Sequence, residues 1–165
     1  VEPWLIPKSY GLSNVSGVLN AVQVQSSLAG SVMITGAGAG GEPTASAVLA
    51  DIVDFANRTK LLSFGRNSSK IKNNYKTNTY TEKFRFYLRF NVIDKSGVLA
   101  SLTSIFRDHE LSIESFIQKS NHEDKTAELV IITHEASKLM LDKALLSINK
   151  LDGVISDPVC LSIYS

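Results

Sequence analysis

The stretch that decides the fold is Phe84-Arg85-Phe86-Tyr87-Leu88-Arg89-Phe90-Asn91-Val92-Ile93-Asp94-Lys95-Ser96-Gly97. Large apolar side chains occupy every even position from 84 to 92, and Arg85, Tyr87, Arg89 and Asn91 stand between them. This period of two predicts a strand with one buried face. The next four residues, 94–97, are typical of a turn. Apolar residues at helical spacing follow, which predicts a helix from 98 to 106.

The rest of the chain continues the alternation of strands and helices. Strands are predicted over 111–119 and 127–134, with a hairpin turn at 121–124 between them. A helix over 139–151 and a last strand over 154–163 complete the order β-α-β-β-α-β. Two right-handed split units of this kind form a four-stranded antiparallel sheet with both helices on one face, the ferredoxin-like fold. The predicted class is therefore α+β.

A shorter α/β segment precedes this domain. Strands are predicted over 1–6, 18–24 and 31–35, and a glycine-rich run then occupies 36–41. Pro43 suits the first turn of a helix, because its φ is already set and its missing N–H is not needed there. Apolar residues between 45 and 56 recur on one face, which predicts an amphipathic helix.

Composition excludes several classes of protein. Of 165 residues, 44% are apolar and 20% charged, so the chain is not disordered as a whole. The net charge of +1 provides no general attraction to nucleic acid or anionic membrane, and no apolar run approaches the ~18 residues of a membrane span. Cys160 is the only cysteine and is predicted to be a core residue, and the three histidines lack ligand spacing. We therefore expect no metal site and a cytoplasmic protein.

Residues 58–89 hold nine basic residues and one acidic residue, a net charge of +8. Within them, residues 63–82 are polar and have neither a helical nor a strand period, which predicts a linker. Nucleic-acid binding by this basic stretch is the weaker alternative, because no folded basic face is predicted. The chain also begins with Val1 inside an apolar run, and we expect it to be a piece of a longer protein.

The run Gly36-Ala37-Gly38-Ala39-Gly40-Gly41 admits two interpretations. Glycines before a helix allow close approach of a phosphate, and a helix N-terminus favours negative charge. However, the spacing is not that of the dinucleotide fingerprint, and Glu42 would repel an anion. A tight structural turn is the other interpretation, and the residues alone favour it.

Two parts of the chain resemble known families. Asn20-Ala21-Val22, the run 36–40, Pro43-Thr44-Ala45-Ser46-Ala47-Val48 and Asp51-Ile52 resemble the C-terminal part of the substrate domain of homoserine dehydrogenase. Asp94-x-x-Gly97-Val98-Leu99 and Leu111-Ser112-Ile113 resemble the ACT domain, a small ligand-binding module. The resemblance implies an incomplete substrate domain over 1–62, a linker over 63–82 and an ACT domain over 83–165.

The resemblance also implies roles. The parent enzyme would interconvert L-homoserine and L-aspartate 4-semialdehyde with NAD or NADP, in threonine and methionine biosynthesis. Its cofactor would touch Gly40, with Gly38 and Ala39 as weaker neighbours. The nucleotide-binding domain and the acid–base residues of the family lie upstream, so we expect no catalytic residue, no bound cofactor and no activity in this chain alone.

The ACT domain is expected to bind an amino-acid effector, with L-threonine as first candidate, and to pair into at least a dimer. Asp94, Gly97, Val98, Leu99 and Ile113 are the expected effector site, in which Asp94 would accept from the ligand's ammonium group. The alternative is that Asp94 only caps the helix and Gly97 only makes the turn. A stand-alone amino-acid sensor without a catalytic parent is the alternative function.

Overall fold

The computed structural model describes residues 1–57, 69, 82–121 and 123–164. Its contacts divide the chain into two compact units, one of Val1–Pro7 and Thr77–Ser165 and the other of Lys8–Lys76. The first seven residues therefore belong to the unit that contains the C-terminal half. The predicted linker, 63–82, lies outside the described residues except for Ser69 and Glu82.

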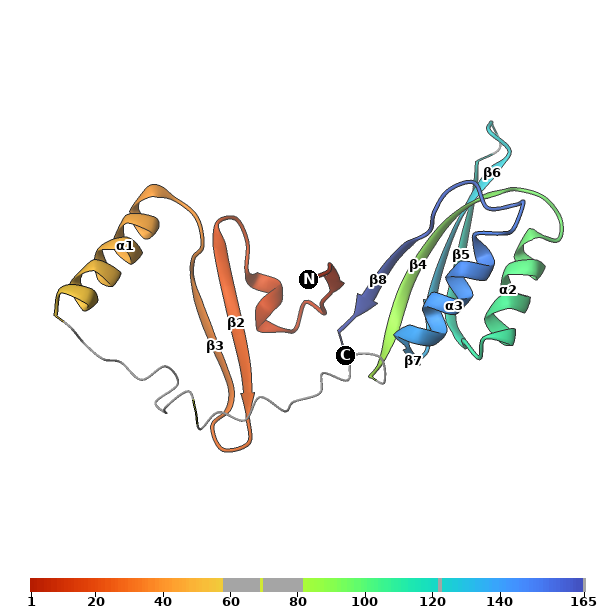
Figure 1. The fold of residues 1–165 in the computed structure, drawn as a ribbon. Helices are drawn as coiled ribbons and strands as arrows, with labels where there is room; N and C mark the ends of the chain where they lie inside the picture. The colour runs from red at the N-terminus through yellow and green to blue at the C-terminus, as the bar shows by residue number, and fades with distance from the viewer. Residues whose placement is uncertain (58–68, 70–81, 122, 165) are drawn as a thin grey trace. The chain divides into compact units, whose positions relative to one another are not determined.

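The larger unit is a mixed sheet with two helices (Figure 1). The strand order is β1-β8-β4-β6-β5, and the short β7 also pairs with β4. The elements are β1 (Trp4–Leu5), β4 (Lys83–Ile93), α2 (Val98–Asp108), β5 (Ile113–Asn121), β6 (Thr126–Thr133), β7 (Ala136–Ser137), α3 (Lys138–Ile148) and β8 (Val159–Ile163). The α+β class and the predicted β-α-β-β-α-β order are confirmed.

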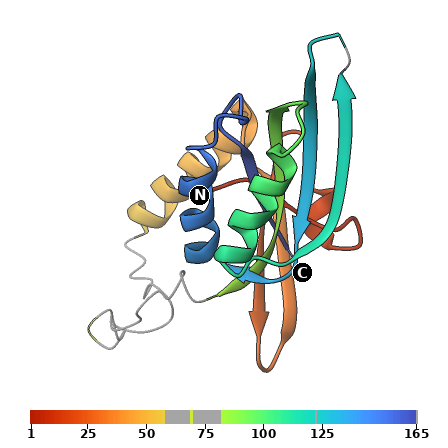
Figure 2. The ribbon, with the colours of Figure 1, turned by 90° about the vertical axis from the view of Figure 1, so that its right-hand side faces the viewer.

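The core lies between the sheet and the two helices. Figure 2 shows α2 and α3 on the same face of the sheet. That face presents the alternate residues 86–92 of β4 and 127–133 of β6, and these residues are buried. The helices contribute the buried residues Leu102, Phe106, Leu141, Ala144 and Ile148. Phe90 and Phe106 meet edge to face, with ring centroids 6.3 Å apart. The even positions of β4 from 86 to 92 are thus buried as their period of two predicts, and Phe84 is partly buried.

Two features differ from the predicted four-stranded sheet. The last strand begins at Val159 rather than 154, because Val154 forms a turn to the Leu151 carbonyl and makes only an isolated bridge to Val92. At the other edge, β1 pairs in parallel with β8, placing Trp4 opposite Ser162. The sequence predicts a strand over 1–6 but not its pairing with the last strand, because a pattern within one segment does not show which strand it will join.

A buried hydroxyl completes the backbone pairing of β4. The N–H of Phe86 donates to Oγ1 of Thr133 at 3.0 Å, and both residues are fully buried. The regular register between β4 and β6 ends at Tyr87 and Ile132, so this side chain takes the place of a strand carbonyl. An unpaired N–H at this depth would be costly.

The smaller unit is a two-stranded ribbon with two helical segments. It consists of the 3-10 helix η1 (Gly11–Asn14), β2 (Leu19–Ser26), β3 (Gly30–Ala37) and α1 (Gly41–Ala56). None of residues 8–57 is buried, and large apolar side chains such as Ile34 and Phe55 are 69% and 86% exposed. The described part of this unit therefore has no core of its own. In the described residues of both units, no helix is long and apolar enough to cross a membrane.

We expect Thr133→Val to lower the free energy of unfolding of the larger unit by about 1–3 kcal/mol. Valine fills the same volume but leaves the Phe86 N–H without an acceptor. Chemical denaturation followed by circular dichroism measures the effect. The control, Thr133→Ser, retains the hydroxyl and loses only a methyl group. A valine variant as stable as the wild type would show that this hydrogen bond is dispensable.

Candidate functional site

The turn between β4 and α2 and the loop between α3 and β8 enclose a cavity of about 480 Å³. The turn side contributes Ile93, Lys95, Ser96, Gly97, Val98 and Ser101. The loop side contributes Leu151, Asp152 and Gly153. The cavity therefore lies at the N-terminal end of α2, where the sequence resemblance places the effector.

Gly97 caps α2 in a conformation that favours glycine. Its φ is +96° and its ψ is −22°, which lie in the left-handed region. A Cβ there would meet no atom within 4 Å, so the backbone conformation rather than a lack of space favours glycine. The N–H of Ser101 donates to the Gly97 carbonyl at 2.9 Å, and its hydroxyl donates to the same oxygen at 3.1 Å. Among the described residues, no carbonyl accepts from the N–H groups of Leu99 and Ala100. These two donors and the helix dipole suit a carboxylate.

The opposite wall is held by a close packing contact. A Cβ on Gly153 would lie 2.7 Å from Cγ2 of Val98, so only glycine allows the loop to approach α2 this closely. The Gly153 carbonyl accepts from the N–H of Ile93 at 2.9 Å, which ties the loop to the end of β4. The two walls of the cavity are therefore joined by packing and by a backbone hydrogen bond.

The walls carry opposite charges. Lys95 stands on the turn and Asp152 on the loop, and both are exposed. Lys95 therefore gives the cavity a cationic end, beside the N-terminal end of α2, and Asp152 gives it an anionic end. A zwitterion such as a free amino acid matches this arrangement.

The predicted effector residues do not all reach this cavity. Gly97 and Val98 line it, whereas Leu99 and Ile113 pack against the hydrophobic core. The side chain of Asp94 is exposed and is not part of the lining, and its N–H donates to the Lys125 carbonyl at 2.9 Å. The residues of the loop side, Leu151 to Gly153, are not among those that the sequence predicts for the effector site. Its only signal in the sequence is Asp152-Gly153, a common turn dipeptide.

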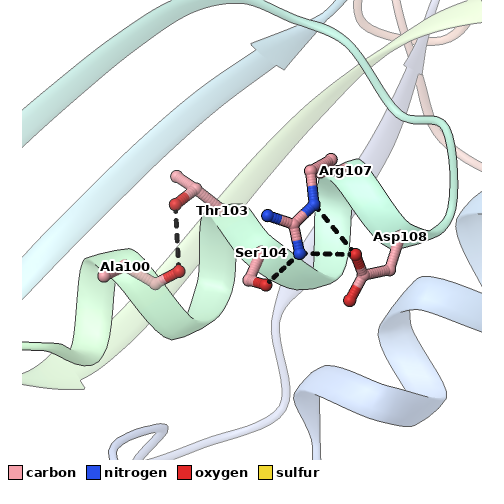
Figure 3. Close-up of polar contacts among 5 residues, drawn as sticks. All are labelled: Ala100, Thr103, Ser104, Arg107 and Asp108. Atoms are coloured by element: carbon pink, nitrogen blue, oxygen red, sulfur yellow. Dashed lines mark hydrogen bonds and ion pairs between the residues drawn. The ribbon is translucent and has the colours of Figure 1, made fainter.

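Arg107, the cationic residue of α2, does not line the cavity. Arg107 lies in the last turn, where its guanidinium donates to Ser104 Oγ at 2.8 Å and to Asp108 Oδ1 at 2.7 and 2.9 Å (Figure 3). Thr103 Oγ1 donates back to the Ala100 carbonyl at 3.1 Å on the same helix. The charge of Arg107 is thus paired locally, and Lys95 is the cation of the cavity wall.

In the smaller unit, the glycine run 36–41 leads into α1. A Cβ on Gly38 would overlap the side-chain amide of Asn20, and the N–H of Gly38 donates to the Val18 carbonyl at 2.7 Å. Gly40 is the residue before α1 and has φ +119°. Packing and backbone conformation thus account for both glycines. Ala39 is exposed, and Glu42 places a carboxylate in the first turn of α1.

The described residues contain no group of three or more histidine, cysteine or acidic side chains that could hold a metal ion. Burial raises the pKa of the Cys160 thiol above its ordinary value, so at neutral pH the residue is a thiol. A thiol held in this form is a poor nucleophile, which agrees with the core role predicted for it.

Comparison with known proteins finds two family models. Residues 1–53 match "Homoserine dehydrogenase" and residues 86–153 match "ACT domain". The homoserine dehydrogenase of Neisseria gonorrhoeae is 37% identical over 93% of this chain, and that of Pseudomonas aeruginosa is 35% identical over 96%. The chain spans only 37% and 38% of the length of these relatives.

Solved structures agree with the sequence matches. The crystal structure of a homoserine dehydrogenase from Thiobacillus denitrificans is 29% identical, with a TM-score of 0.77 over 98% of this chain and 38% of that one. A homoserine dehydrogenase structure from Staphylococcus aureus, 24% identical with a TM-score of 0.52, shows likeness of fold alone. By sequence and by fold, the chain is related to the homoserine dehydrogenases, of which it resembles little more than a third, and its residues 86–153 match the ACT domain.

Proposed function

We propose that the cavity between the β4–α2 turn and the α3–β8 loop binds a free amino acid and that the chain is the regulatory part of a homoserine dehydrogenase. The observation that carries this proposal is the position of Lys95 and Asp152 on opposite walls of one cavity at the N-terminal end of α2. The ligand's carboxylate would lie at the start of α2 and its ammonium group at Asp152. L-Threonine is the first candidate, because it is an end product of the pathway proposed for the parent enzyme.

The reaction of that parent is the interconversion of L-homoserine and L-aspartate 4-semialdehyde. When bound, NAD or NADP supplies the hydride chemistry, and a protein supplies orientation and acid–base groups. In this chain, Gly38, Ala39 and Gly40 would contact the cofactor through exposed backbone before α1. The cofactor would be held between these residues and an N-terminal nucleotide-binding domain of the same protein. We propose the cytoplasm as the compartment of that protein.

The ACT domain would pair with a second copy. The sheet face opposite the helices presents Tyr87, Val130 and Ile132 next to Ile117, and β5 lies at the end of the strand order. Open sheet faces and free strand edges tend to be covered by a partner. Two effector sites would then lie in one assembly.

Exchange of one carboxylate tests the ligand's orientation. We expect threonine at about ten times its Kd to raise the melting temperature of the wild-type chain by roughly 6–10 °C. Asp152→Asn should remove most of this shift, because it removes the anionic end of the cavity. The matched control, Asp94→Asn, removes a nearby carboxylate that does not line the cavity and should retain the shift. Loss of the shift in the Asp94 variant alone would assign the ammonium site to Asp94 instead.

The contact between Gly153 and Val98 gives a second test. Gly153→Ala should cost about 1–3 kcal/mol of stability through overpacking and should weaken effector binding, because Val98 must move. Denaturant unfolding and calorimetric titration measure the two effects. Gly36→Ala is the control, since a Cβ there meets no atom within 4 Å. Wild-type stability and affinity in the Gly153 variant would contradict the close packing.

Activity measurements test the relation to the parent enzyme. The purified chain should not reduce NAD or NADP in the presence of homoserine at any pH, because the proposed acid–base residues belong to the domain upstream. Absorbance at the reduced-nicotinamide band follows the reaction. Turnover that co-purifies with the chain and scales with its concentration would overturn this division of roles.

A further inference from the structure

The cavity between the β4–α2 turn and the α3–β8 loop carries two kinds of uncharged side chain. Ile93, Val98 and Leu151 are apolar, whereas Ser96 and Ser101 have hydroxyl groups. The two charged side chains of the cavity match the ammonium and carboxylate groups that all free amino acids share, so they do not distinguish one amino acid from another. Selection of the ligand's side chain must therefore come from the uncharged part of the wall.

Ser101 lies on the face of α2 that the α3–β8 loop approaches. It follows Gly97 by four residues and Val98 by three, and residues at these spacings are neighbours on a helix surface. A Cβ on Gly153 would meet Val98 first, with Cγ2 at 2.7 Å, so this face of the helix is turned toward the loop. The hydroxyl of Ser101 therefore stands one helical turn from the apolar contact that joins the two walls.

An internal hydrogen bond limits what this hydroxyl can do. Ser101 Oγ donates its one proton to the Gly97 carbonyl at 3.1 Å. Because a hydroxyl has one donor and two acceptor lone pairs, the oxygen can only accept from a further partner while this bond is kept. A ligand that excludes water from the oxygen must supply a donor in its place, since an unpaired acceptor costs binding free energy. The hydroxyl of a ligand's side chain is such a donor.

We propose that Ser101 makes the cavity selective for an amino acid that carries both a hydroxyl and a methyl group on its Cβ. This inference rests on the proposed amino-acid site and names the residue that distinguishes the ligand's side chain. The ligand's hydroxyl donates to Ser101 Oγ, and its methyl group packs against the apolar part of the wall. L-Valine has the shape and charges of L-threonine but no hydroxyl. L-allo-Threonine has the hydroxyl and the methyl group in exchanged positions.

These three ligands test the proposal by calorimetric titration. We expect the wild-type chain to bind L-threonine about three- to tenfold more tightly than L-valine, and more tightly than L-allo-threonine. In Ser101→Ala, the affinity for threonine should fall to that for valine, because the acceptor for the ligand's hydroxyl is gone. The affinity for valine should stay nearly unchanged, which also shows that the variant is folded.

The matched control is Thr103→Val. Thr103 Oγ1 donates to the Ala100 carbonyl at 3.1 Å on the same helix, but Thr103 does not line the cavity (Figure 3). This variant removes a comparable hydrogen bond and should retain the preference for threonine. Loss of the preference in Thr103→Val would overturn the role of Ser101, because the effect would then not be local to the cavity.

Two further outcomes would overturn the role of Ser101 and leave the amino-acid site in place. One is equal binding of threonine and valine to the wild type. The other is an equal loss of both ligands in Ser101→Ala, which would show that the residue contacts a group that both ligands share. Absence of binding of all three amino acids to the wild type would instead overturn the proposed site itself, and the role of Ser101 with it.

Discussion

The larger unit depends on the burial of one face of β4 against α2 and α3. Phe86, Leu88 and Phe90 are completely buried, and the strand that carries them pairs with β6 on one side and with β8 on the other. Each fully buried side chain of this size contributes about 1.5–3 kcal/mol. The proposed effector cavity lies at the end of this strand, beside Ile93. Its position therefore follows from the register of β4.

The proposed effector site is made by two segments that are more than fifty residues apart. The β4–α2 turn supplies Gly97 and the start of α2, and the α3–β8 loop supplies Asp152 and Gly153. They meet because Ile93 and Gly153 share a backbone hydrogen bond and because Gly153 has no side chain to keep Val98 away.

The two units differ in what their own residues can bury. The larger unit closes its core, whereas none of residues 8–57 is buried and the apolar side of α1 is exposed. The chain spans little more than a third of the length of its curated relatives. An amphipathic helix and a two-stranded ribbon gain little stability alone, because most helical stability in proteins comes from packing of the apolar face. The apolar residues that predict these elements therefore remain exposed in the part of the smaller unit that the structure describes.

The sequence by itself determined the elements and their order. The period of two over 84–92 and the helical spacing after Gly97 are local patterns, and they predict the strand, the turn and the helix because each residue's face follows from its position along the element. Residues 20–22, 36–40, 43–48 and 51–52 together carry the resemblance to homoserine dehydrogenase, and residues 94–99 and 111–113 carry the resemblance to the ACT domain. The tertiary structure alone decided that Asp152 rather than Asp94 lines the cavity, and that β1 joins β8 with Trp4 opposite Ser162. These contacts join segments that are far apart in the chain. The periodicity and spacing of residues within one segment do not determine which distant segment will pack against it.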